Sequence, residues 1–283
     1  MRLGFIGLGV MGAPMCRNLA AKSGAAVLAF DLLPERVPRG SRTAGSPAEL
    51  ARESDVVFLA LPGGTQLAQL SSALLAEARP GLTVVDCGTS PVALTRELAA
   101  RFGERGAAYA DAPIARTRQA AEDGTLSIMV GADEAIFTRI RPLLAHMASD
   151  ITHCGPVGSG QIANIMNNMV LIQTVVALSE AIAVARRAGM DGAVLLDALA
   201  KGSADSFALR NHAAKAVLPG IFPERAFSAE YALKDLGYAL ELAREAGLAL
   251  PGAELATGIL RRAIAAGDGA LYWPVISRVI GVA

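Results

Sequence analysis

The sequence predicts an α/β fold in which a doubly wound parallel sheet is followed by an all-helical C-terminal domain. Short apolar runs alternate with segments of helical periodicity in the first half of the chain, and the first run leads into a glycine-rich turn. From Gly160 onward the apolar pattern is helical only. Because 283 residues are enough for two domains, we place them at residues 1–157 and 158–283.

Strands of the first domain are expected where runs rich in Val, Ile, Leu and Ala lie between turn residues. These runs are residues 2–8, 26–31, 55–61, 82–86, 107–110, 125–130 and 151–154. The segment from Ser46 to Glu49 is a capping box with proline at the first helical position, so a helix should start there. Further helices are expected over residues 13–21, up to residue 100, and over 133–145. Strands that alternate with helices predict a parallel sheet.

The second domain begins with a long helix over residues 162–188, which Gly189 should end. Polar residues interrupt its apolar pattern, so we expect a buried helix and no membrane span. Shorter helices are expected over residues 191–199, 227–246, 254–266 and 273–280. A small helical domain this rich in alanine and leucine would expose apolar faces, which predicts a homodimer or homotetramer.

The glycine-rich turn carries the clearest functional signal. The motif is Gly7-Leu8-Gly9-Val10-Met11-Gly12, between the first strand and the first helix. Its glycines suit a tight turn, a close approach of the backbone to a pyrophosphate, and close packing of helix on strand. The helix N-terminus then offers N–H groups to the phosphates. The sequence therefore predicts a Rossmann-like, dinucleotide-binding domain.

Asp31 ends the second expected strand, where a carboxylate accepts hydrogen bonds from ribose hydroxyls and repels a 2′-phosphate. This favours NAD over NADP, although Arg36 nearby would soften the preference. Ligands of such sheets bind at the carboxyl ends of the strands. The turns at Leu61-Pro62 and at Thr89 should therefore border the cofactor.

Charge and composition exclude several classes of partner. The formal net charge is zero and Lys and Arg are dispersed, so neither nucleic acid nor a membrane surface is expected. The three cysteines lack CxxC spacing, which fits a cytoplasmic protein. The histidines lack metal-ligand spacing, and we predict no metal site. A small molecule is the expected partner.

Polar residues in apolar surroundings mark a second candidate region. Asn164 and Asn168 lie on one side of the long helix, where their amides need hydrogen-bond partners. They either tie this helix to the first domain or bind substrate. Arg116, in the loop after residue 113, has a planar guanidinium suited to an anionic group. Lys234 and Asp235 form either a surface pair or a cleft-facing lysine with its neighbour.

Together these residues resemble the β-hydroxyacid dehydrogenase family, which includes 3-hydroxyisobutyrate dehydrogenases and tartronate semialdehyde reductases. The resemblance spans the whole chain. It rests on motifs at residues 7–15, 111–113, 155–169, 234–236 and 268–276. It implies hydride transfer between NAD(H) and a small 3-hydroxy acid or semialdehyde.

The resemblance also implies roles for single residues. Thr89 should border the nicotinamide, Asn168 should bind substrate, and Lys234 should lie beside both nicotinamide and substrate. The loop Ala115-Arg116-Thr117 should hold the substrate's acidic group. Most members have Ser-Gly-Gly in this loop, and the Arg-Thr pair is similar to sulfolactaldehyde reductases. A sulfonate, a phosphate or a second carboxylate would each suit the arginine.

Asn164 occupies the position of the family's catalytic lysine. A lysine ammonium can protonate the alkoxide that hydride transfer creates, whereas an amide can only hydrogen-bond to it; loss of acid–base help costs about 10²–10⁴-fold in rate. Three interpretations follow: an inactivated dehydrogenase; an enzyme that does not need this lysine, such as an imine reductase or one in which Lys234 takes over; or a cofactor-binding module without turnover.

Overall fold

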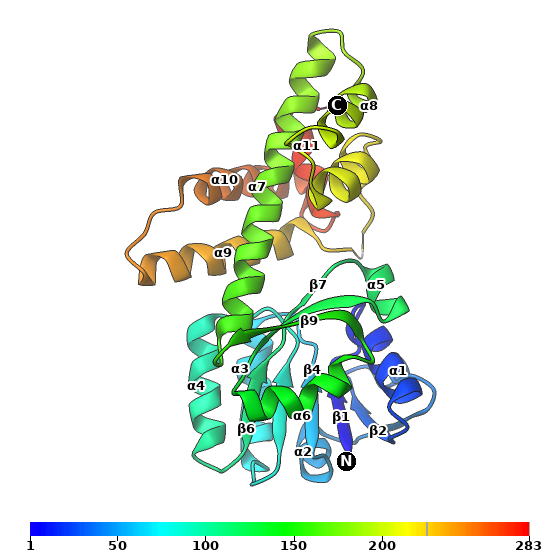
Figure 1. Ribbon diagram of the computed structural model, residues 1–283, viewed down its shortest axis with the longest axis vertical. Helices are drawn as coiled ribbons and strands as arrows, with labels where there is room; N and C mark the ends of the chain where they lie inside the picture. The colour runs from blue at the N-terminus through cyan, green and yellow to red at the C-terminus, as the bar shows by residue number, and fades with distance from the viewer. Residues whose placement is uncertain (225, 283) are drawn as a thin grey trace. The chain divides into compact units, whose positions relative to one another are not determined.

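The computed structural model describes residues 1–224 and 226–282 and contains two compact units. The first spans Met1–Asn164 and the second begins at Ile165. Figure 1 shows a mixed α/β unit and a unit made of helices. This confirms the fold class expected from the sequence. The units divide inside one long helix, α7 (Ser159–Arg187), whereas the expected boundary lies just before it.

The first unit is built on one nine-stranded sheet with the order β3-β2-β1-β4-β5-β6-β8-β7, in which β9 pairs with β8. The strands are β1 (Leu3–Ile6), β2 (Val27–Phe30), β3 (Ser41–Thr43), β4 (Val56–Leu59), β5 (Thr83–Asp86), β6 (Ala108–Asp111), β7 (Ile114–Ala115), β8 (Leu126–Gly131) and β9 (Ala148–Gly155). Strands β1 to β6 are parallel, and all of them except β3 were predicted. The sheet is mainly parallel, as the doubly wound prediction requires, and β8 is the exception, because it is antiparallel to β6 and β7. The segment between β7 and β8 is shorter than the dozen or so residues that a parallel crossover needs.

Helices cover both faces of this sheet. One face packs against α1 (Gly12–Lys22), α5 (Arg118–Asp123) and α6 (Glu134–Leu144), and the other against α2 (Pro47–Glu53), α3 (Gly64–Ala76) and α4 (Val92–Gly103). Successive strand residues point to opposite faces of the sheet: Phe58 packs on the face covered by α1, α5 and α6, and Leu59 on the face covered by α2, α3 and α4. The doubly wound arrangement places the carboxyl ends of β1, β2, β4 and β5 along one edge, where ligands of such sheets bind.

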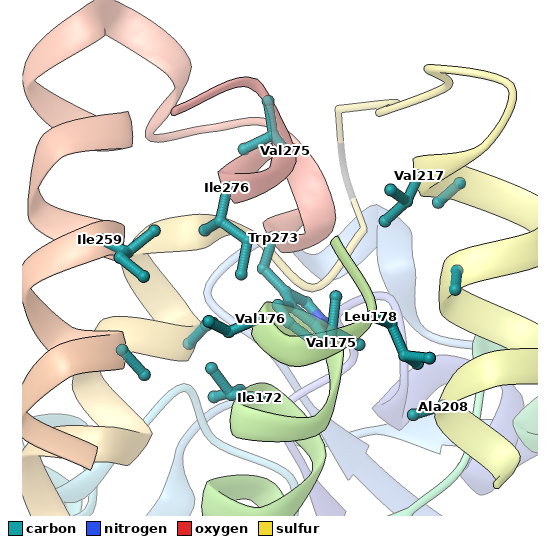
Figure 2. Packing of buried hydrophobic residues seen from close by; sticks show 14 of the residues in the cluster. Ile172, Val175, Val176, Leu178, Ala208, Val217, Ile259, Trp273, Val275 and Ile276 are labelled. Carbon is teal, nitrogen blue, oxygen red and sulfur yellow. The ribbon is translucent and has the colours of Figure 1, made fainter. Parts of the chain in front are cut away.

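The second unit contains only helical elements and isolated bridges among its described residues. They are α7, α8 (Gly192–Ala200), a π-helical segment (Leu209–Val217), α9 (Ala229–Glu245), α10 (Pro251–Ala263), a π-helical turn (Ile264–Asp268), a 3₁₀ turn (Trp273–Val275) and α11 (Ile276–Ile280). Trp273 is fully buried and lies among the side chains of Ile172, Val175 and Val176 from α7 (Figure 2). The segment 209–217 was not expected to be helical.

Helix α7 is long and apolar enough to cross a membrane by length and composition alone. Of its most apolar window, 44% is buried inside the protein, and a single helix of this kind is weak evidence for a membrane span. Val170 and Val184 on α7 are exposed. Leu248 and Leu255, elsewhere in the second unit, are also exposed. This unit therefore presents several large apolar side chains to solvent.

Candidate active site

The glycine turn between β1 and α1 has the geometry that a pyrophosphate requires. Gly7 has a φ of +91°, and a Cβ there would lie 2.4 Å from the carbonyl oxygen of Ala60. A Cβ on Gly12 would lie 1.9 Å from the carbonyl oxygen of Gly7. A Cβ on Gly9 would meet nothing within 4 Å among the described residues. The first and third glycines are therefore needed for the turn itself, and the second leaves open space for a ligand.

Asp31 supports this turn directly. Its Oδ2 accepts a hydrogen bond of 2.6 Å from the N–H of Leu8, and its Oδ1 accepts one of 2.9 Å from the N–H of Leu33. The guanidinium of Arg36 lies 3.7 Å from Oδ1. A carboxylate has lone pairs beyond these contacts, so it can still accept ribose hydroxyls. Val10 and Met11 lead into α1, which begins without a side-chain cap.

Substituting the glycines separates a binding effect from a folding effect. We expect Gly9→Ala to leave the melting temperature nearly unchanged but to weaken NADH binding at least about tenfold, because its methyl group enters the space for the pyrophosphate. We expect Gly12→Ala to destabilise the first unit by about 1–3 kcal/mol, since its methyl group overlaps a backbone oxygen. Thermal unfolding and NADH fluorescence titration measure both effects. Equal loss of stability in the two variants would contradict this assignment.

Thr89 and Asn164 meet in the first unit. The turn after β5 brings Thr89 to the helix α7, and the Nδ2 of Asn164 donates a hydrogen bond of 2.9 Å to the Oγ1 of Thr89. Asn164 is only 1% exposed, and its Oδ1 has no hydrogen-bond partner among the described residues. The other turn expected near the cofactor, Leu61-Pro62, contacts the same loop, because a Cβ on Gly88 would lie 2.9 Å from the carbonyl oxygen of Leu61.

The loop from Ala115 to Thr117 is fixed by two of its side chains. Arg116 has a φ of +87°, a conformation that non-glycine residues rarely adopt. Its guanidinium donates to the carbonyl oxygen of Thr125 and the hydroxyl of Ser149, and lies 2.8 Å from Asp150. Thr117 caps α5 through its hydroxyl. The predicted anion-binding arginine is thus paired with a carboxylate of the protein.

In the second unit, Asp235 holds both Asn168 and Lys234. Its Oδ2 accepts a hydrogen bond of 2.8 Å from the amide of Asn168, and its Oδ1 lies 3.0 Å from the ammonium of Lys234. The ammonium also lies over the rings of Tyr231 and Tyr238. Burial raises the pKa of Asp235, and Lys234 partly opposes this shift. The surface-pair interpretation is wrong for Asp235, which is 2% exposed.

Two family profiles together match almost the whole chain. The family profile described as "NAD binding domain of 6-phosphogluconate dehydrogenase" matches residues 2–155. The profile described as "NAD-binding of NADP-dependent 3-hydroxyisobutyrate dehydrogenase" matches residues 158–272. The chain belongs to the β-hydroxyacid dehydrogenase family. This β-hydroxyacid dehydrogenase is therefore an NAD-dependent oxidoreductase of hydroxy acids, as the sequence predicts.

Three relatives illustrate the range of the β-hydroxyacid dehydrogenases. The 2-(hydroxymethyl)glutarate dehydrogenase of Eubacterium barkeri is 34% identical over 95% of this chain and 91% of its own. The NAD-dependent L-serine dehydrogenase of Pseudomonas aeruginosa is 32% identical over 98% and 97%. The Mycobacterium tuberculosis 3-hydroxyisobutyrate dehydrogenase, in a structure with L-serine, has a TM-score of 0.90 and 31% identity, with 99% of both chains covered.

Sequence reasoning missed several residues that organise this dehydrogenase. Asp150 pairs with Arg116, Asp235 holds Asn168, and Gln161 bonds to the loop that carries Thr89. Of these, Asp235 was named in the sequence with Lys234, and only its contact with Asn168 was missed; Asp150 and Gln161 had no sequence signal. Within residues 1–224 and 226–282, no cluster of three or more His, Cys, Asp or Glu side chains could hold a metal ion.

Proposed function

We propose that this protein interconverts a small 3-hydroxy acid carrying a primary alcohol with the corresponding semialdehyde, using NAD. The names of the three relatives support this substrate class. 2-(Hydroxymethyl)glutarate, L-serine and 3-hydroxyisobutyrate share one core, a CH₂OH group on the carbon that bears the carboxylate. They differ only in the third substituent on that carbon. The observation that carries the proposal is the open glycine turn backed by Asp31 in a chain that aligns along its full length with such enzymes.

In this proposal the residues of the first unit bind the cofactor and the reacting oxygen. NAD, when bound, supplies the hydride acceptor. Gly9 leaves space for the pyrophosphate, and Asp31 binds the adenosine ribose. Thr89 and Asn164 hydrogen-bond to the oxygen on the carbon that gains or loses the hydride. Asn168 and Lys234 keep the substrate roles that the family resemblance implies for them.

The amide of Asn164 can hydrogen-bond to either form of the substrate, the carbonyl or the alcohol. A threonine hydroxyl can donate or accept, so its contact with Asn164 works with the amide in either orientation. With Nδ2 turned toward the substrate, the amide donates to a carbonyl oxygen. With Oδ1 turned toward it, the amide accepts from a hydroxyl, or from the N–H of an iminium. The buried Oδ1 without a partner is the observation that favours the second candidate function, imine reduction. Neither orientation transfers a proton, so in this proposal the proton that oxidation releases passes to solvent water.

Arg116 should bind the third substituent of the substrate when that substituent is anionic. We expect Arg116→Gly to raise KM for 2-(hydroxymethyl)glutarate about 10- to 100-fold, because one charge-assisted hydrogen bond is lost. The KM for 3-hydroxyisobutyrate should change little. Arg118→Ala is the matched control, since Arg118 is an exposed neighbour that pairs with Glu122. Steady-state oxidation with NAD⁺ measures all three proteins. If Arg116→Gly shifted neither KM, the arginine would serve only the loop, through Asp150.

Two further proposals concern the state of the protein in the cell. A homodimer or homotetramer packed through the second unit would cover its exposed apolar side chains, among them Val184, Leu248 and Leu255. A cytoplasmic location agrees with three cysteines that form no disulfide in the described residues. We propose neither a nucleic-acid nor a membrane partner.

A further inference from the structure

Two buried carboxylates lie side by side at the carboxyl ends of β5 and β6. Asp86 and Asp111 are partners in the strand register, and both are fully buried. Burying a charge is costly unless it is well hydrogen-bonded, so each needs strong donors. Burial raises the pKa of Asp86 to about 7, with a further contribution from the Asp111 charge. Burial raises the pKa of Asp111 to about 6.

Asp111 binds the N-terminus of helix α7. Its Oδ1 accepts a hydrogen bond from the N–H of Gly158 and its Oδ2 one from the N–H of Gln161, both at 2.7 Å. These N–H groups belong to the unpaired first turn of the helix, where the dipole also favours an anion. Gly131 must be glycine for this contact, because a Cβ there would lie 2.4 Å from the carboxylate. Asp111 therefore fixes where α7 starts.

Gln161 joins α7 to the loop that carries Thr89. Its Oε1 accepts the N–H of Ser90 at 3.1 Å, and its Nε2 donates to the carbonyl oxygen of Gly88 at 2.8 Å. The donor and acceptor on the loop determine the orientation of this amide. Asp86 supports the same loop by accepting the N–H of Gly88 at 2.9 Å and the hydroxyl of Ser90 at 3.1 Å. Thr89 is thus held through the residues on both sides of it.

Asn164 lies three residues after Gln161 and so faces the same side of α7. Its contact with Thr89 completes the network. The side chain of Gln161 hydrogen-bonds to the backbone of the loop, and the side chain of Asn164 hydrogen-bonds to the side chain of Thr89. We propose that Gln161, supported by Asp86 and Asp111, is a positioning residue that fixes Thr89 and Asn164 relative to each other. The inference rests on the proposed function, which places these two residues at the reacting oxygen.

Two substitutions at residue 161 test the role of its side-chain amide. Gln161→Glu keeps the acceptor for Ser90 but sets an anionic oxygen against the carbonyl of Gly88 and the carboxylate of Asp86. Gln161→Leu removes both hydrogen bonds at similar volume. At about pH 8, we expect both to lower kcat for 3-hydroxyisobutyrate oxidation on the order of 10- to 100-fold, the scale of a small misplacement at a reacting centre. The affinity for NADH should stay within about twofold, since Asp31 and Gly9 are untouched.

The pH dependence separates positioning from packing. Protonation of the introduced glutamate restores a hydrogen-bond donor toward the carbonyl of Gly88. The kcat of Gln161→Glu relative to the unaltered protein should therefore recover at about pH 6. The leucine variant has no such group and should not recover. The titratable groups around this position are Asp86, Cys87, Tyr109 and Asp111, with Cys154 beyond them. All the proteins share these groups, and Gln161→Leu shows their contribution alone. The introduced glutamate lies next to Asp86, so recovery in Gln161→Glu reports proton uptake by that pair. Gln69→Glu, at an exposed position of α3, is the matched control.

Hydrogen exchange of residues 87–90 gives a second readout that needs no turnover. After correction for intrinsic rates, we expect faster exchange in both variants at about pH 8 and regained protection in Gln161→Glu alone at about pH 6. Unchanged exchange, or equal loss of kcat at both pH values in both variants, would overturn the inference. If exchange changes as expected while the unaltered protein oxidises none of the proposed hydroxy acids, the proposed substrate class fails and the positioning role stands.

Discussion

Replacing Asn164 by lysine should raise kcat for oxidation of 3-hydroxyisobutyrate or L-serine by about 10²–10⁴-fold, the usual contribution of a positioned acid–base group. Asn164 is buried and bonded to Thr89, so a lysine introduced there would reach the same region in place of the amide. The gain should grow as pH rises toward the pKa of the new lysine, because oxidation needs the neutral amine as base. NADH production measured against pH tests both expectations.

The control for this substitution lies on the same helix. Val170→Lys adds the same charge at an exposed position farther along the helix, and we expect it to leave kcat unchanged. A gain in Asn164→Lys alone would identify the unaltered chain as a dehydrogenase that lacks its proton-transfer group. No gain would reject that interpretation. Turnover of cyclic imines by the unaltered protein would then support imine reduction, and NADH binding without any turnover would support a binding module.

Lys234→Met should cost about 2–3 kcal/mol of stability and lower kcat by about 10²-fold. The loss of stability follows because Asp235 becomes a buried carboxylate without its cation. It lies below the range of about 3–5 kcal/mol for broken buried pairs, since the side chain of Lys234 is 27% exposed. Burial already raises the pKa of Asp235. The loss should therefore be largest at high pH and shrink as the pH falls and Asp235 takes up a proton. The expected loss of kcat follows from the substrate role proposed for Lys234, because a positive charge would then be missing where charge develops in the reaction.

The double variant Lys234→Met/Asp235→Asn distinguishes the two effects. A neutral amide at residue 235 needs no cation and can still accept the hydrogen bond from Asn168, so stability should return while kcat stays low. Lys201→Met, which breaks the exposed pair with Asp197, should change stability by less than about 0.5 kcal/mol. Urea unfolding at two pH values and steady-state kinetics provide the measurements. Recovery of kcat in the double variant would assign Lys234 a structural role only.

Local patterns explain which parts of the fold and site the sequence could predict. The glycine turn and Asp31 were predictable because each depends on a few consecutive residues with a known backbone requirement. Strand β3 was not, because Ser41-Arg42-Thr43 is a polar edge strand without an apolar run. Helix α5 was missed because it has only six residues.

The partners of the site residues depend on distances through space, which the sequence does not contain. Nothing near Arg116 indicates that Asp150 will bind its guanidinium, and nothing near Gln161 indicates the backbone groups of Gly88 and Ser90. The positive φ of Arg116 also had no local signal, except that most family members have glycine there. Asn164 and Thr89 were both named as site residues, but their contact was not predicted.

The conformation of Arg116 bears on how this loop could have evolved. Glycine adopts a positive φ freely, whereas arginine is strained there by about 1–3 kcal/mol unless other contacts hold it. Asp150 and Ser149 supply such contacts. An ancestor that acquired the acid at residue 150 before the arginine at residue 116 would have avoided a less stable intermediate. The order of the two changes would therefore matter, and each residue would now limit which substitutions the other tolerates.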